Sequence, residues 1–120
     1  MEDTVKGKGR IRVEGKIWLN IGDETFLGKG KIELLEKIKE HGTLRKAAEA
    51  MDISYRQAFS HVKKINNLSD KPLIVLKHGG KGGGGSSEIT EVGEKAITTF
   101  RQFQKDFAKF LEEKTNILDF

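Results

Sequence analysis

The stretch Ile53–Thr90, ISYRQAFSHVKKINNLSDKPLIVLKHGGKGGGGSSEIT, decides the fold. Along it a helical pattern gives way to a strand pattern, and the strand pattern is then interrupted by a glycine-rich loop. Ser54 followed three residues later by Gln57 forms a capping-box pattern, which predicts that a helix begins here and runs to about Asn67. Pro72 then ends the helical pattern, because proline cannot continue a helix and favours an extended residue before it.

Residues 73–76 form a short apolar strand pattern, and a glycine-rich loop leads from it to a return strand at Ile89. As a plain flexible linker, the loop would need no lysine and need not join two strands. As the tip of a wing, its glycines would let Lys81 and backbone amides approach phosphates. A nucleotide-binding loop fails on spacing, because Gly82 follows Lys81 and Val75 stands where that motif begins with glycine.

The helix itself has two contrasting faces. Its predicted inner face is apolar and comprises Tyr55, Ala58, Phe59, Val62 and Ile65. Its predicted outer face is polar and comprises Arg56, Gln57, Ser60, His61 and Lys64, flanked by Lys63 and Asn67. These residue types are the ones that read base edges in the major groove: Arg for guanine, Gln or Asn for adenine, Ser for either. For His61 a neutral surface histidine is an equally good interpretation.

The preceding residues supply the rest of a helix-turn-helix. A first helix is predicted from about Lys31 to Glu40, and Gly42 ends it. Thr43 can cap a second helix, whose apolar residues recur at i, i+3, i+4 and i+7: Leu44, Ala47, Ala48 and Met51. Before these helices, alternating apolar residues over 10–27 predict a β-hairpin. The helical core is thus expected over 31–68 and the wing over 73–90.

The last helix, predicted over 91–115, carries an apolar heptad seam. The seam comprises Ala96, Phe100, Phe103, Phe107 and Phe110. A monomer could bury this stripe against its own body. So many phenylalanines on one terminal helix instead favour a homodimer interface.

The distribution of charge along the chain indicates a binding site for a polyanion. From Ile53 to Gly85 there are six basic residues and one acidic residue, whereas the remainder holds 16 basic and 17 acidic residues. A solvated charged face is the simpler interpretation of charge alone; the helix pattern favours DNA. The residues predicted to contact DNA are Ser54, Tyr55, Arg56, Gln57, Ser60, His61, Lys63, Lys64, Lys77, His78 and Lys81.

Other functional classes find little support. The chain of 120 residues suits a single domain over 1–120 and contains no cysteine. Its three histidines are far apart, and no spacing predicts a metal site, a catalytic residue or a cofactor. No apolar run suits a membrane span or a signal peptide. A cytoplasmic, non-enzymatic protein is therefore expected.

Three segments resemble the N-terminal DNA-binding domain of the ModE family of molybdate-responsive transcriptional regulators: 53–59, 66–68 and above all the loop 79–85. The resemblance implies an α+β, mainly α, winged helix-turn-helix distantly similar to that of LysR-type regulators. It also implies an N-terminal β-hairpin, a long C-terminal dimerisation helix and an operator with dyad symmetry.

The chain ends at Phe120, where family members that sense molybdate continue into oxyanion-binding domains of the Mop type. Three interpretations stay open: a stand-alone regulator, a chain served by a separate oxyanion-sensing protein, and a truncated chain. The predicted function is a homodimeric, sequence-specific DNA-binding regulator without the molybdate-binding domains. The alternative is a winged-helix module that binds proteins and does not bind DNA specifically.

Overall fold

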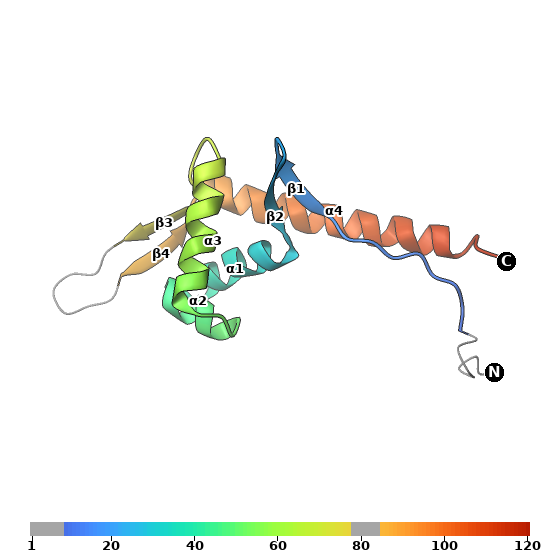
Figure 1. Cartoon of the computed structure of the whole chain (residues 1–120), viewed down its shortest axis with the longest axis horizontal. Helices are drawn as coiled ribbons and strands as arrows, with labels where there is room; N and C mark the ends of the chain where they lie inside the picture. Colours follow the sequence, from blue (N-terminus) through green and yellow to red (C-terminus); the bar gives the residue numbers. More distant parts are fainter. Residues whose placement is uncertain (1–8, 78–84) are drawn as a thin grey trace.

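The computed structural model describes residues 9–77 and 85–120, and it has the predicted α+β, mainly helical, winged helix-turn-helix architecture (Figure 1). Its elements follow in the order β1 (Trp18–Ile21), β2 (Glu24–Gly28), α1 (Lys29–His41), α2 (Leu44–Ala50), α3 (Tyr55–Leu68), β3 (Ile74–Lys77), β4 (Ser86–Ile89) and α4 (Glu91–Thr115). The two strand pairs are separate antiparallel hairpins.

The N-terminal hairpin is shorter than the predicted range of 10–27. Strand pairing begins at Trp18, opposite Gly28, and Gly22 makes the turn with a φ of +59°. The preceding residues run alongside α4 (Figure 1). There the Val13 N–H donates to Thr115 Oγ1 at 3.1 Å. The alternating pattern upstream of Trp18 therefore forms no strand, and this segment lies against α4 instead.

The three-helix core forms as local signals predict. Gly42 ends α1 in the left-handed conformation, with a φ of +79°, and its N–H donates to Ile38 O. The hydroxyl of Thr43 caps α2 by accepting the Lys46 N–H at 3.1 Å. Two fully or nearly fully buried alanines, Ala47 and Ala48, let α2 pack closely against its neighbours.

The wing, formed by β3 and β4, is attached to the core at its base. Ile74 pairs with Ile89, and Lys77 pairs with Ser86. Ser87 is buried, donates its N–H to Gly42 O at 2.8 Å and accepts the Leu44 N–H on its Oγ at 3.0 Å. The base of the wing is thus fixed against the α1–α2 corner, and the hairpin extends away from the body opposite the free end of α4 (Figure 1).

Helix α4 begins inside the core and ends outside it. Thr90 caps it by accepting the Gly93 N–H at 3.0 Å, and Phe100 is completely buried. The later turns extend beyond the body, so the chain measures 64 × 30 × 22 Å. Its radius of gyration is 18.7 Å, whereas about 14 Å is expected for a compact domain of this length.

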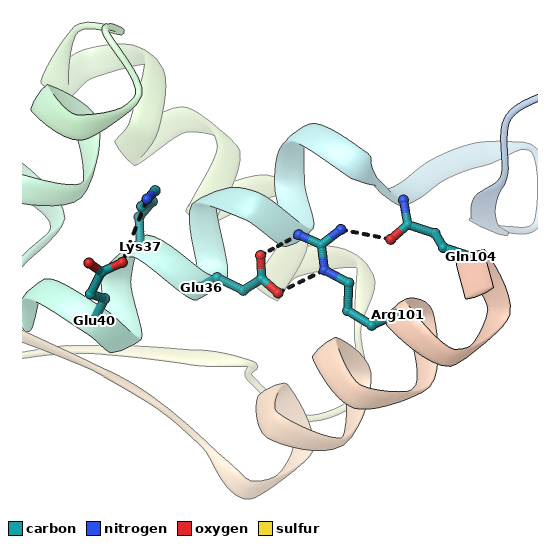
Figure 2. A network of polar contacts seen from close by, with 5 residues as sticks. All are labelled: Glu36, Lys37, Glu40, Arg101 and Gln104. Carbon is teal, nitrogen blue, oxygen red and sulfur yellow. Dashed lines mark hydrogen bonds and ion pairs between the residues drawn. The ribbon is translucent and has the colours of Figure 1, made fainter. Parts of the chain in front are cut away.

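Two ion pairs connect α1 to α4: Lys39 with Glu94, at 2.8 Å, and Glu36 with Arg101 (Figure 2). The Arg101 guanidinium donates to both carboxylate oxygens of Glu36, with Nε 2.8 Å from Oε2. It also donates to Gln104 Oε1 at 2.7 Å. The hydrogen bond from Arg101 lowers the pKa of Glu36, and the same bond raises the pKa of Arg101.

Candidate nucleic-acid interface

The exposed face of α3 is a polar stripe at helical spacing. Arg56, Ser60, Lys63 and Asn67 follow at i, i+4, i+7 and i+11, and all four are exposed. The opposite face buries Ala58, Val62 and Ile65. Lys63 and Asn67, which were predicted to flank the outer face, are thus exposed on the same side of the helix as Arg56 and Ser60.

The two cap residues are engaged with the backbone. Ser54 Oγ accepts the Gln57 N–H at 3.0 Å, and Gln57 Oε1 accepts the Ser54 N–H at 3.1 Å. The capping box predicted from the sequence is confirmed. Because its oxygen is used in this way, Gln57 has only its side-chain amide donors left for a base or a phosphate.

Tyr55 and Phe59 are not on the inner face, and this part of the helix prediction was wrong. They are 44% and 41% exposed, and their rings stack with centroids 6.2 Å apart. The buried stripe is narrow and runs through Ala58 and Val62, so the two rings lie at its edge.

Arg45, on α2, contributes to this surface and was missed by the sequence analysis. Its guanidinium carbon lies 5.1 Å from the centroid of the Tyr55 ring, a cation–π arrangement. Arg45 is ten residues away from Tyr55 in the sequence, so no local spacing signals the contact. The contact brings a second helix, and a further positive charge, to the N-terminal end of α3.

The basic residues differ in how they are paired. Arg56 and Lys63 form no ion pair with any residue of the described ranges. Lys64 lies 3.8 Å from Glu24 on the N-terminal hairpin, and Lys77 lies 3.1 Å from Glu88 across the wing. These two pairs are exposed, and such pairs are weak, so phosphates can compete for both lysines.

Two predicted contacts, His78 and Lys81, lie outside the described residues, as does most of the glycine-rich loop. Lys77, immediately before them, is exposed at the end of β3. Of the predicted α3 contacts, Arg56, Ser60 and Lys63 thus share the outer face, and Lys77 ends the first strand of the neighbouring wing hairpin.

His61 lies beside two lysines. Partial burial lowers its pKa most, and the positive charges of Lys31 and Lys64 lower it further. Burial and the charge of Lys64 also lower the pKa of Lys31. Lys31 belongs to α1 and was missed by the sequence analysis. The imidazole of His61 is thus biased towards its neutral form, and a bound anion would favour its protonation.

Asn66 determines where the wing stands relative to α3. Its Oδ1 accepts the Leu73 N–H at 2.9 Å, and its Nδ2 donates to Ile74 O at 2.8 Å. The side chain is only partly exposed. Its amide bonds the backbone groups of Leu73 and Ile74 in place of a neighbouring strand. The sequence singled out Asn66 by resemblance only, because no periodic pattern identifies such a bond.

The predicted dimer residues on α4 fall into two groups. Phe100 is fully buried in the chain's own core, and Ala96 packs against that core, so Phe100 is inaccessible to a second chain. Phe103 and Phe110 are 44% and 48% exposed, and Phe107 is partly exposed.

A cleft of about 520 Å³ separates α4 from the N-terminal hairpin and the residues before it. Trp18, Phe107 and Leu111 are among the apolar side chains that line it, and Trp18 is 57% exposed. Phe107 and Leu111 of α4 line this cleft, and Phe103 and Phe110 are exposed on the same helix.

No profile of a known protein family matches the chain. The chain is 30% identical, over 95 residues, to the molybdenum transport protein ModE of Azotobacter vinelandii; the match covers 79% of this chain and 35% of that protein. It is 30% identical over 90 residues to the DNA-binding transcriptional dual regulator ModE of Escherichia coli K12, covering 75% and 34%. The chain is related to the N-terminal region of the ModE family.

A further relative of this family, the molybdenum-pterin-binding protein MopA of Rhodobacter capsulatus, is 36% identical over 85 residues; the match covers 71% of this chain and 32% of MopA. The chain therefore spans about a third of the length of the curated ModE-type relatives that it matches. Within the described ranges, no helix is long and apolar enough to cross a bilayer, and no three His, Asp or Glu side chains gather as a metal site.

Proposed function

We propose that the chain is a sequence-specific DNA-binding transcriptional regulator that acts as a homodimer. The observation that carries this proposal is the exposed stripe of α3, on which Arg56, Ser60 and Lys63 share one face and neither basic residue forms a described ion pair. No residue of α3 is acidic, so the whole helix attracts phosphates. A helix of about 10–12 Å diameter fits the major groove, which is about 12 Å wide.

The contacts divide into two kinds. Arg56 and Ser60 would read base edges, because an arginine can donate two hydrogen bonds to guanine and a serine can donate or accept. Arg45, Lys63 and Lys77 would bind phosphates, which supply most of the affinity and make it depend on salt. Lys81 and His78 are proposed as further backbone contacts from the wing.

The proposed dimer interface is the protruding half of α4. Phe103, Phe107 and Phe110 remain accessible there, and Ile117 and Phe120 are 71% and 89% exposed. Contact with water makes this surface unfavourable, and a second copy would cover it. Helix α3, here called the reading helix, lies at the end of the body opposite the protruding half of α4 (Figure 1). A dimer through α4 therefore leaves both α3 helices free for two half-sites.

A binding titration tests the proposal. The purified chain is titrated with a duplex selected from a random pool, and with unselected random duplex, at several salt concentrations. A specific regulator binds the selected duplex at least about a thousandfold more tightly than random DNA. Equal affinity for both refutes sequence specificity. An absence of salt-dependent DNA binding, together with a stable complex with another protein, would favour the interaction-module hypothesis.

The proposal of a separate oxyanion-sensing protein rests on the resemblance to the ModE family and on the similarity to a molybdenum transport protein and a molybdenum-pterin-binding protein. Adding molybdate to the chain–DNA complex is its first test. If molybdate, at constant ionic strength, changes the affinity of the chain for DNA with no other protein present, a separate sensor is unnecessary.

A further inference from the structure

Two aromatic side chains of α3 are exposed and do not belong to the hydrophobic core. Tyr55 and Phe59 are 44% and 41% exposed and stack on each other with an interplanar angle of 20°. The guanidinium of Arg45 lies against Tyr55 and holds one end of the pair. The stacking and the cation–π contact favour this ring geometry before any ligand binds, which reduces the entropy lost on binding.

The position of the pair restricts what can cover it. Tyr55, Phe59 and Lys63 form one row along α3, at i, i+4 and i+8. The adjoining row begins with Arg56. A ligand that covers the rings must therefore be apolar at the rings and negatively charged beside them.

A DNA duplex has this arrangement. The 5-methyl group of thymine is the apolar group that base pairs display in the major groove, and phosphates line both sides of that groove. Phe59 has no hydrogen-bonding atom, so it can gain only from apolar contact. We infer that Phe59, supported by Tyr55, recognises thymine methyl groups and makes the chain prefer a thymine at one position or more in each half-site.

This inference rests on the proposed DNA-binding function, and a single experiment separates the two. A duplex is first selected from a random pool by the full chain. Each thymine of the selected site is then replaced singly by deoxyuridine, which lacks only the 5-methyl group. The measured quantity at each position is the ratio of the two Kd values, uridine duplex over thymine duplex.

With the unaltered chain, this ratio should be about four at one or more positions, because burying one methyl group has about that effect on an equilibrium constant. With Phe59→Ala it should fall to about one at the same positions. Lys63→Ala is the matched control on the same row of the helix: it should weaken binding to both duplexes equally and leave the ratio at about four.

Circular dichroism verifies that each variant keeps its helices. Phe59→Gln, which retains helix propensity and removes the ring, serves as a second variant and should also give a ratio of about one. A ratio near one at every thymine with the unaltered chain, or an unchanged ratio with both Phe59 variants, overturns the inference and leaves the proposed function intact. Failure of the full chain to enrich any duplex overturns the proposed function itself.

Discussion

The side chain of Asn66 holds the backbone of Leu73: Oδ1 of Asn66 accepts the Leu73 N–H at 2.9 Å. The same amide donates to the carbonyl of Ile74 at 2.8 Å. One residue at the end of α3 thus fixes the first strand of the wing. Because α3 and the wing are proposed to contact the same duplex, the angle between them sets which phosphates the wing can reach.

Asn66→Ala should lower the free energy of unfolding by about 1–3 kcal/mol, because it leaves buried backbone groups without partners. It should also weaken DNA binding by misplacing the wing. Chemical denaturation and a binding titration measure the two effects. The matched control is Asn67→Ala. Asn67 is adjacent and exposed, and its side chain makes no described hydrogen bond, so this substitution should leave the free energy of unfolding nearly unchanged. Equal stability losses in both variants would contradict the role of Asn66.

Gly93→Ala should destabilise the chain by about 1–3 kcal/mol, because the added Cβ would meet backbone. A Cβ at Gly93 would stand 2.4 Å from the Leu73 carbonyl oxygen and 2.7 Å from Ile89 Cγ2. Gly30→Ala is the control, since no atom lies within 4 Å of a Cβ at this helical position. It should be neutral or stabilising by up to about 1 kcal/mol. Thermal unfolding of both variants gives the comparison, and a Gly93→Ala chain as stable as the wild type would refute the close packing.

The Glu36–Arg101 pair predicts a pH-dependent contribution to stability. The pKa of Glu36 lies below its ordinary value of 4.5 in the folded chain, chiefly because Arg101 donates to its carboxylate. The stabilisation is therefore fully present above about pH 4.5 and is lost as the pH falls through the folded pKa. Both side chains are partly exposed, so the effect should be about 1 kcal/mol or less.

Glu36→Gln should accordingly be less stable than the wild type at pH 7, and the difference should shrink at pH 3. Urea denaturation at the two pH values measures this change. The control is Glu113→Gln, an exposed α4 carboxylate without a described ion pair. A difference between Glu36→Gln and the wild type that stays constant with pH would show that the pair contributes nothing through its charge.

Arg56→Ala should cost about 1–3 kcal/mol of binding free energy on the selected duplex and less on random DNA, because Arg56 is proposed to contact a base. Lys105→Ala removes the same charge from an exposed position on α4, remote from α3, and should change neither affinity appreciably. Fluorescence anisotropy titrations on both duplexes decide the matter. Equal losses on selected and random DNA would assign Arg56 to a phosphate.

Phe103→Glu and Phe110→Glu should each convert the proposed dimer into a monomer, because each places a charge on the apolar surface of α4. Sedimentation velocity measures the oligomeric state. Thr98→Glu introduces the same charge at an exposed α4 position off this surface and should leave the dimer intact. A wild-type chain that sediments as a monomer at every concentration would refute the interface directly.

The sequence alone determined several of the points where helices begin or end. The capping box of Ser54 and Gln57, the cap Thr43 and the helix-ending Gly42 all act where local patterning predicted. These signals are reliable because each satisfies backbone groups within a few residues of itself. The basic composition of α3 was equally readable, since it needs no knowledge of the neighbouring elements.

The tertiary structure alone decided which side chains are covered. Phe100 enters the core while Phe103 stays exposed, and Tyr55 and Phe59 remain outside it, Tyr55 in contact with Arg45. Ser87 and Asn66, which no periodic pattern marks, hold the wing in place. Periodicity predicts that a helix has an apolar side. It does not predict how many of the apolar side chains the neighbouring elements bury. That number depends on elements distant in the sequence, whose positions only the folded chain fixes.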